Sequence, residues 1–267
     1  MSIGDKKLFL LDMDGTIYLS DRLFDGAAEF LALVKARGGR YVFLSNNSSR
    51  GTEAYIEKLG RMGIPTGPED YLTSADVLIR DLLRSGEDRL WYLCGTRSLK
   101  AQLRAAGIRV AEGREGAEGV LLGYDTELSY EKLENCCILL NAGVPYLATH
   151  PDPVCPTWYG SAPDCGSVIE MLFTCTGRRP RILGKPRPDM ARMAMEKFGF
   201  SRRETCLLGD RVYTDIACGV NAGIDTAFLL SGEGVEADIE KYGVRPTWVF
   251  PHIRAVLEEM LNGEGEK

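Results

Sequence analysis

The stretch that decides the fold is FLLDMDGTIYLS, residues 9–20, in which an apolar run ends at two aspartates one residue apart. Asp12 and Asp14 stand where a buried strand would end, and glycine and threonine follow them. Neighbouring carboxylates repel each other and lose hydration on burial, so both effects oppose folding. The pair therefore indicates a functional site in which another group compensates the negative charge.

The composition around this stretch is that of a globular, water-soluble chain. Of its 267 residues, 45% are hydrophobic and 26% are charged. The net charge of -6 argues against a nucleic-acid partner, which normally requires a basic face. The opening apolar stretch is too short for a signal peptide, and no later run approaches the length of a membrane span. We expect a cytoplasmic protein with no membrane partner, whose eight cysteines are free thiols.

Short apolar runs alternate with stretches of helical period on both sides of the chain's centre. This alternation predicts βαβ units and a parallel, Rossmann-like sheet with helices on both faces. The expected strands cover residues 7–11, 41–45, 205–209, 226–232 and 247–250. The expected helices include residues 27–38, 53–63 and 253–263, with a further helix after 214–223.

A second alternating set occupies residues 84–181 and has the length of a domain. We therefore predict a discontinuous α/β core, residues 1–83 and 182–267, with an α/β cap domain inserted between its two parts. Such a cap would exclude water from the site and recognise the leaving group.

Polar residues also follow three other apolar runs. They are Ser45 and Asn46 after YVFL, Lys185 after RIL, and Asp210 and Asp215 in LLGDRVYTD. Each has an ordinary alternative, such as a helix cap, a turn or a solvated lysine. Ligands of open α/β sheets bind outside the carboxyl ends of the strands, where these residues would gather with the two aspartates of the opening stretch. Their convergence favours a functional site.

Taken together, these motifs resemble the haloacid dehalogenase superfamily of phosphohydrolases. DMDGT is similar to its first motif, Ser45 to its second, Lys185 to its third and GDRVYTD to its fourth. The segments LSNNSSR and LGKPRPDM, with an insert between the second and third motifs, further resemble the NagD-like or p-nitrophenyl phosphatase branch. The resemblance spans nearly the whole chain and implies a phosphatase. Dehalogenases of this superfamily lack the second aspartate, so Asp14 favours a phosphate ester over a carbon–halogen bond.

Phosphoryl transfer requires charge neutralisation, in-line positioning and the transfer of one proton. On this resemblance Asp12 is the nucleophile that forms an aspartyl phosphate, and Asp14 is the general acid and base. Ser45 and the amide of Asn46 would hold a phosphoryl oxygen, and Lys185 would balance the negative charge.

Several acids in one site cannot all stay ionised without a cation, so a hard divalent metal is implied. We expect Mg²⁺ with ligands from Asp12, Asp210 and the main-chain carbonyl of Asp14. Asp215 would orient Lys185 or a metal-bound water.

The predicted cap offers substrate contacts in the segment ATHPDPVCPTWYG, which reads as a proline-punctuated loop after a strand. His150 and Asp152 are the candidates for substrate contact, whereas packing explains Trp158 and Tyr159. Arg211, beside the fourth motif, is a further candidate for substrate binding. In related proteins the cap mediates dimers, so the resemblance implies a homodimer.

The sequence also allows other functions. GEGVEA matches a dinucleotide-binding pattern at Gly232, Gly234 and Ala237, but too little chain follows it for the second half of such a fold. A non-catalytic phospholigand-binding protein or a phosphotransferase could use the same fold. For a phosphatase, the substrate would be a small phosphorylated metabolite of the sugar phosphate, nucleotide, phosphoglycolate or pyridoxal phosphate type, with p-nitrophenyl phosphate as an artificial substrate.

Overall fold

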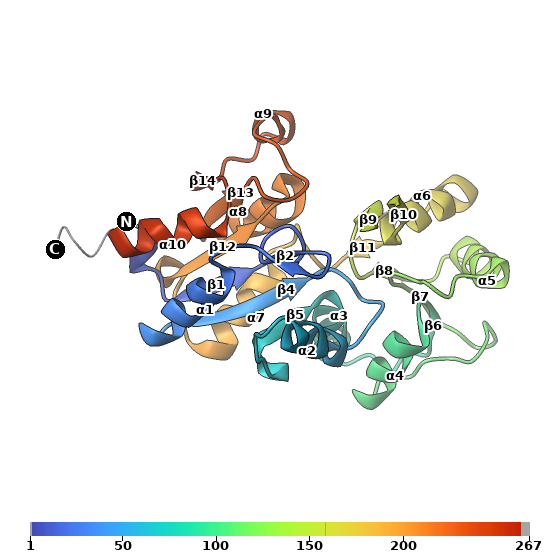
Figure 1. Ribbon diagram of the computed structural model, residues 1–267. Helices are drawn as coiled ribbons and strands as arrows, with labels where there is room; N and C mark the ends of the chain where they lie inside the picture. Colours follow the sequence, from blue (N-terminus) through green and yellow to red (C-terminus); the bar gives the residue numbers. More distant parts are fainter. Residues whose placement is uncertain (1, 158, 263–267) are drawn as a thin grey trace. The chain divides into compact units, whose positions relative to one another are not determined.

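The computed structural model describes residues 2–157 and 159–262, so Trp158 lies outside the described residues. The chain divides into two compact units (Figure 1). The first holds the chain up to Ser45, Tyr55–Leu72 and the chain from Lys185 onward. The second holds Asn46–Ala54 and Thr73–Gly184.

The first unit is built on a six-stranded sheet with the strand order β14-β13-β12-β1-β4-β5. These strands are β1 (Leu8–Leu11), β4 (Arg40–Ser45), β5 (Tyr71–Thr73), β12 (Thr205–Gly209), β13 (Asp225–Leu229) and β14 (Trp248–Phe250). The pairs that join β14, β13, β12, β1 and β4 are all parallel. The predicted parallel α/β core is confirmed.

Helices cover both faces of this sheet, as the burial of every residue in β1 and β12 requires. They are α1 (Ala27–Ala36), α2 (Thr52–Arg61), α7 (Asp189–Phe198), α8 (Ala217–Ala222) and α10 (Ile253–Asn262). A further short helix, α9 (Ala237–Tyr242), has no buried residue and contacts the segment Val212–Ile216. Helices α1 and α10 lie side by side (Figure 1), and their apolar faces pack on Phe9, Leu11 and Phe43. A short hairpin, β2 (Tyr18–Leu19) and β3 (Arg22–Leu23), follows β1.

Short helical turns complete the first unit. Three are 3₁₀ turns, at Ile3–Asp5, Pro68–Asp70 and Arg202–Glu204, and one is a π-helical turn at Val212–Ile216. In the π-helical turn the amides of Asp215 and Ile216 both donate to the carbonyl of Arg211. Turns of this kind occur frequently at functional sites.

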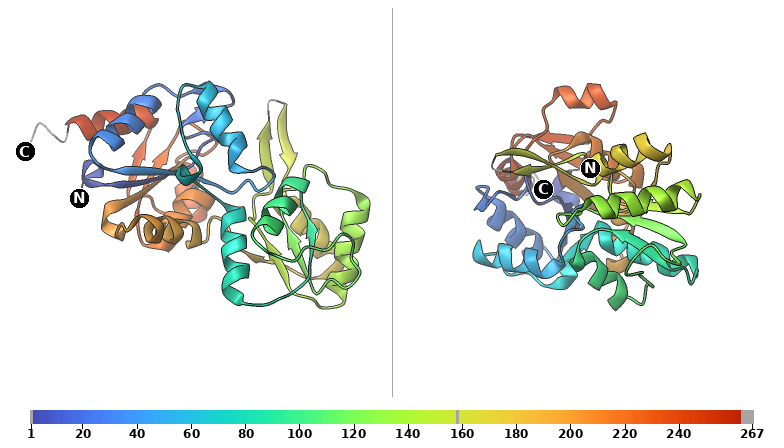
Figure 2. Two further views of the ribbon diagram at one scale, coloured as in Figure 1. Left: turned by 90° about the horizontal axis from the view of Figure 1, so that it is seen from below. Right: turned by 90° about the vertical axis from the view of Figure 1, so that its right-hand side faces the viewer.

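The second unit has its own four-stranded parallel sheet with the order β11-β8-β7-β6. Its strands are β6 (Trp91–Cys94), β7 (Gly119–Leu122), β8 (Tyr146–Ala148) and β11 (Arg181–Ile182). Its helices are α3 (Ser74–Ser85), α4 (Arg97–Ala105), α5 (Tyr130–Asn141) and α6 (Cys165–Thr176). Each helix begins at a side-chain cap, for example Thr73 before α3 and Asp164 before α6. Figure 2 shows α5 and α6 together, and both contribute to one apolar core.

The predicted insert, residues 84–181, lies wholly inside the second unit, which extends further to Thr73 and Gly184. Helix α3 belongs there because it packs against α4 and because Ser74 Oγ donates to the carbonyl of Asn46 at 2.5 Å. The functional division into core and cap at residues 84 and 181 stays a prediction.

Two local expectations differ from the structure. The proline-containing segment after residue 150, which we expected to be a loop, contains two strands. They are β9 (Val154–Thr157) and β10 (Gly160–Pro163), which pair antiparallel. Its prolines fit because an isolated two-stranded ribbon has only edge strands, where a missing amide is tolerated. In addition, the strand before Lys185 is β11, which pairs with β8 in the second unit, so Lys185 does not extend from a strand of the six-stranded sheet.

Within the described part of the chain, we find no helix that combines the length and the apolar character needed to cross a membrane.

Candidate active site

Two of the predicted acids meet at one end of the first unit's sheet because of the strand register. Leu11, the last residue of β1, lies between Leu208 of β12 and Phe43 of β4. Asp12 continues this alignment, since its amide donates to the carbonyl of Leu208 at 2.9 Å. Asp210 follows directly after β12, so both acids lie at the same edge of the sheet, and their carboxylate oxygens come within 4.8 Å of one another.

Lys185 is the cation of this site. Its side chain is only 3% exposed, and its Nζ donates to Asp12 Oδ1 at 2.6 Å, to Asp215 Oδ1 at 2.7 Å and to the carbonyl of Leu44 at 3.2 Å. Burial favours a neutral amine, but the two carboxylates more than offset it and hold the pKa of Lys185 above its ordinary value. The side chain is thus a fixed, fully charged cation beside Asp12.

Asp12, Asp210 and Asp215 form the one group of potential metal ligands found among the described residues, with ligand atoms within 4.8 Å of one another. Asp210 and Asp215 are almost completely buried. Burial and the neighbouring carboxylates raise the pKa of Asp210 to about 8. Burial, aided by Asp215 and opposed by Lys185, raises the pKa of Asp12 to about 6. The cluster therefore carries more negative charge than Lys185 neutralises.

The oxygens of these acids are not equivalent. Asp215 uses both, because Oδ1 accepts from Lys185 and Oδ2 accepts from the amide of Arg211 at 3.1 Å. Asp210 uses Oδ2, which accepts from the amide of Glu233 at 2.8 Å, whereas its Oδ1 is buried without a hydrogen-bond partner. A buried carboxylate oxygen without a donor is costly, and a bound cation would satisfy it.

Asp14 lies in the turn between β1 and the β2–β3 hairpin and keeps part of its surface in solvent. Desolvation by the surrounding protein raises its pKa, while Lys58 and Arg211 act in the opposite direction. Sequence reasoning did not single out Lys58, because a lysine on the polar side of an amphipathic helix predicts only solvation.

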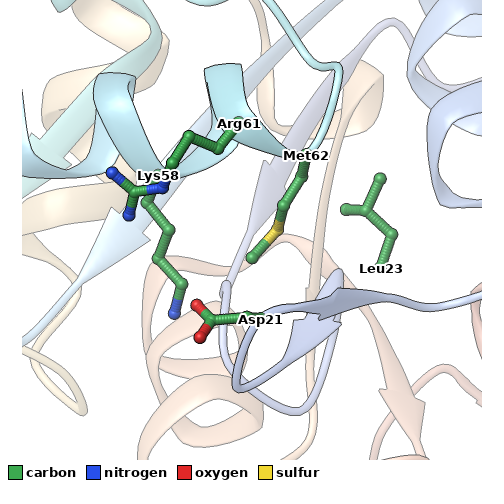
Figure 3. A pocket seen from close by; sticks show the side chains of 5 residues that line it. All are labelled: Asp21, Leu23, Lys58, Arg61 and Met62. Carbon is green, nitrogen blue, oxygen red and sulfur yellow. The ribbon is translucent and has the colours of Figure 1, made fainter.

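Lys58 lines a pocket of about 340 Å³ beside the hairpin, together with Asp21, Leu23, Arg61 and Met62. Figure 3 shows the Lys58 ammonium and the Asp21 carboxylate directed toward one another across this pocket. Lys58 Nζ also lies 4.0 Å from the centre of the Tyr18 ring. The residue thus places a positive charge next to the segment that carries Asp14.

Ser45 ends β4, and its Oγ lies 3.3 Å from the hydroxyl of Tyr55 on α2. Tyr55 in turn stacks on Tyr71, with 5.9 Å between ring centres. Sequence reasoning missed Tyr55, because an aromatic residue at helical spacing predicts packing rather than contact with a site.

Arg211 is directed to a carboxylate in this structure. Its guanidinium pairs with Glu233 Oε2 at 2.9 Å, and its side chain is 17% exposed. Although burial opposes the charge, Asp12 and Asp210 hold the pKa of Arg211 above its ordinary value. Contact between Arg211 and substrate stays a prediction.

The predicted cap residues meet inside the second unit. Asn46 Nδ2 donates to both carboxylate oxygens of Asp152, at 3.1 and 3.2 Å. His150 has no exposed surface and lies between Asp152, 3.6 Å from its Nδ1, and Asp164, 3.5 Å from its Nε2. Tyr159, by contrast, is exposed. For Asp164 the sequence indicates only a helix cap and not a contact with His150. Substrate binding by His150 and Asp152 stays a prediction, and a fully enclosed imidazole would have to be uncovered first.

Comparison with known proteins assigns the chain to a family. The family model for haloacid dehalogenase-like hydrolases matches residues 9–109, and a second model of HAD-hydrolase-like proteins matches residues 182–256. An acid sugar phosphatase of Staphylococcus aureus strain USA300 is 30% identical over 254 residues, which cover 95% of this chain and 98% of that protein.

Two solved structures extend the comparison. A 4-nitrophenylphosphatase from Thermotoga maritima is 38% identical, with a TM-score of 0.90 over 96% of this chain and 98% of that one. A glycerol phosphate phosphatase from Mycobacterium tuberculosis, solved in complex with magnesium, is 28% identical, with a TM-score of 0.88 over 96% of this chain and 78% of that one. The chain therefore belongs to the haloacid dehalogenase-like hydrolases, as a member of their NagD-like branch of phosphatases.

Proposed function

We propose that this phosphatase is a Mg²⁺-dependent phosphomonoester hydrolase that transfers the phosphoryl group of a small metabolite to Asp12 and then to water. One observation carries the proposal: the Asp12 carboxylate is held by the buried, charged Lys185 amid a cluster of further acids. Such a carboxylate is oriented for attack and does not need to be deprotonated by another group.

The donor set fits Mg²⁺. Carboxylate and carbonyl oxygens are the ligands this hard cation prefers, and Asp210 Oδ1 is a buried oxygen without a partner. Asp12, Asp210 and the main-chain carbonyl of Asp14 would hold the ion. Asp215 has both oxygens engaged, so we assign it to orienting Lys185 and the π-helical turn. When bound, Mg²⁺ would neutralise the cluster and polarise a phosphoryl oxygen.

The remaining residues account for the other requirements of phosphoryl transfer. An oxygen of Asp12 attacks phosphorus, and the bond to the leaving oxygen breaks as Asp14 donates a proton to it. Water then attacks the phosphorus of the aspartyl phosphate as its proton passes to Asp14. The bond between phosphorus and the Asp12 oxygen breaks, inorganic phosphate leaves, and both acids are restored. Ser45 and the amide of Asn46 would hold the transferred group through hydrogen bonds, and Lys185 would stabilise its charge.

For the substrate we propose a small sugar phosphate or polyol phosphate, with nucleotide, phosphoglycolate and pyridoxal phosphate types as alternatives. The names of two relatives, acid sugar phosphatase and glycerol phosphate phosphatase, support this order. We also propose that His150 and Asp152 in the second unit contribute to selectivity, and that the protein forms a homodimer through this unit, which size-exclusion chromatography with light scattering would test.

The function is tested by phosphate release from p-nitrophenyl phosphate and from a panel of metabolite phosphates, with Mg²⁺ and with a chelator. We expect Mg²⁺-dependent release from several esters. Release without added Mg²⁺ would contradict the metal requirement. Mg²⁺ binding without release from any ester would favour the non-catalytic phospholigand-binding alternative. Quantitative recovery of phosphate as inorganic phosphate, in the presence of sugar acceptors, separates hydrolysis from phosphotransfer.

The pKa shifts of the acids predict that Mg²⁺ affinity rises with pH. Asp12 titrates at about 6 and Asp210 at about 8 in the metal-free protein. Protons therefore compete with the cation for both residues, and deprotonation strengthens binding. The two carboxylates interact and lose their protons as a pair. The association constant for Mg²⁺ should rise by at least about tenfold between pH 6 and pH 8. Isothermal titration calorimetry at several pH values measures this rise.

The same titration supplies its own control. Near pH 7 the Asp12–Asp210 pair holds about one proton in the metal-free protein, so Mg²⁺ binding should release about one proton. Calorimetry in buffers with different enthalpies of ionisation counts that proton. An affinity that is constant between pH 6 and pH 8, without proton release, would contradict the raised pKa values.

A further inference from the structure

The segment Ser231–Gly234 packs around Asp210. It follows β13 and contains the glycines of the dinucleotide-like pattern GEGVEA. The amide of Glu233 donates to Asp210 Oδ2 at 2.8 Å, and the amide of Gly234 donates to the main-chain carbonyl of Asp210 at 3.1 Å. Two consecutive backbone amides therefore hold both the side chain and the main chain of one residue.

The glycines of this segment are needed for the close approach. A Cβ on Gly232 would lie 2.0 Å from Asp210 Oδ2, and a Cβ on Gly234 would lie 2.2 Å from the carbonyl oxygen of Asp210. Neither glycine has a positive φ, so conformational freedom is not what they supply. Direct packing on Asp210 explains both glycines without a bound dinucleotide.

The segment is also tied to the turn that carries Asp14. Ser231 Oγ donates to the carbonyl of Gly15 at 2.8 Å. A Cβ on Gly15 would itself lie 2.4 Å from Asp210 Oδ2. On its other side, Glu233 Oε2 pairs with Arg211. The backbone of two separate loops thus encloses the same carboxylate oxygen, and Asp210 Oδ1 is left buried and unpaired.

We propose that Ser231–Gly234 is a positioning loop that fixes the Asp210 carboxylate in one orientation and thereby makes the metal site selective for Mg²⁺ over Ca²⁺. This inference rests on the proposed metal site and adds a determinant of its selectivity. Mg²⁺ requires near-ideal octahedral geometry at short distances, whereas Ca²⁺ accepts longer and more variable coordination. A carboxylate with a single allowed orientation suits the smaller ion, and a carboxylate that can rotate removes this advantage.

The test replaces Gly232 by alanine and measures Mg²⁺ and Ca²⁺ binding by calorimetry, without substrate. The added methyl group forces the Asp210 carboxylate to move. Loss of a group that orients a metal ligand typically lowers affinity about 10- to 100-fold, so we expect Mg²⁺ binding to weaken at least tenfold. Ca²⁺ binding should weaken by less than about threefold, because its coordination adapts. The ratio of the two affinities is a readout that general structural damage would not change.

Gly60→Ala is the matched control. Gly60 also has no positive φ, and a Cβ there meets no atom within 4 Å, so both affinities should remain those of the wild type. Ser231→Ala is a second variant in case Gly232→Ala does not fold. It removes only the tie to Gly15 and should weaken Mg²⁺ binding about threefold, with Ca²⁺ unchanged.

Equal weakening of both ions in a folded Gly232→Ala protein would show that the loop only packs, and unchanged Mg²⁺ affinity would also overturn the proposal. Measuring Mg²⁺ binding and phosphate release separately in the wild type distinguishes a failure of the loop proposal from a failure of the proposed hydrolase function. A wild type that binds Mg²⁺ but releases no phosphate refutes the hydrolase, yet it still tests the loop.

Discussion

Asp12→Asn is expected to lower phosphate release by at least about 10⁴-fold, the scale at which removal of a nucleophile reduces turnover in other hydrolases. The amide has nearly the shape of the carboxylate, and its oxygen can still accept the hydrogen bond from Lys185. It is, however, a poor nucleophile. The protein should remain folded, because Lys185 keeps its ion pair with Asp215 and the substitution removes a partly buried carboxylate whose pKa is already raised. Phosphate release at saturating Mg²⁺, with circular dichroism of the same sample, measures both.

Comparison of Asp14→Asn with Asp12→Asn distinguishes the general acid from the nucleophile. Loss of a general acid typically costs about 10²- to 10⁴-fold. The loss should be smallest with p-nitrophenyl phosphate, because nitrophenolate is a stabilised leaving group that needs little protonation. It should be largest with alkyl phosphates such as glycerol phosphate. Asp12→Asn should instead abolish turnover of both classes equally. Residual activity of Asp12→Asn within tenfold of the wild type would exclude Asp12 as the nucleophile.

The positions of the core acids could be predicted from the sequence because they depend on a simple rule of topology. Apolar runs alternating with helical periods indicate a parallel sheet, and polar residues that end such runs meet at its carboxyl edge. Asp12 and Asp210 follow β1 and β12, and Ser45 is the last residue of the neighbouring strand β4, so all three satisfy this rule. Asp215 does not end a strand, but the short spacing to Asp210 kept it near, and the π-helical turn directs it to Lys185.

The rest of the site could not be predicted, because its residues come from elements whose local pattern has an ordinary explanation. Tyr55 has the spacing of a core residue in α2, and Glu233 stands in a glycine-rich loop that resembles a different motif. The contact of Tyr55 with Ser45 depends on how α2 packs beside the end of β4, and the contact of Glu233 with Asp210 is made by a main-chain amide, which the side-chain pattern does not predict. The burial of His150 between Asp152 and Asp164 could not be predicted either, because the position of a histidine after a strand does not indicate whether its side chain is buried.

Lys185→Met is expected to destabilise the metal-free protein strongly at pH 8. Methionine keeps the length and the apolar stem of lysine but leaves Asp12 and Asp215 without their shared cation. Removing one partner of a buried ion pair costs about 3–5 kcal/mol, because the remaining charges stay desolvated. The free energy of unfolding from urea denaturation measures this loss. Lys7→Met is the matched control, since the Lys7–Glu204 pair is solvent-exposed and should contribute little.

The loss should depend on pH in a direction that the pKa of Asp12 fixes. In the wild type this pKa is about 6, above the ordinary value of 3.8, so the folded state binds the proton more tightly than the unfolded state. The contribution of Asp12 to stability is therefore complete below about pH 4 and declines as the pH rises through 6. Without Lys185 the pKa rises further, and the decline continues to higher pH. The difference in the free energy of unfolding between wild type and Lys185→Met should consequently be smaller at pH 5, where Asp12 becomes neutral, than at pH 8.

At pH 8 Mg²⁺ should restore part of the lost stability, because it supplies positive charge to the same carboxylates. A difference that is independent of both pH and Mg²⁺ would mean that Lys185 contributes by packing alone, and its assignment as the charge-balancing residue would fail.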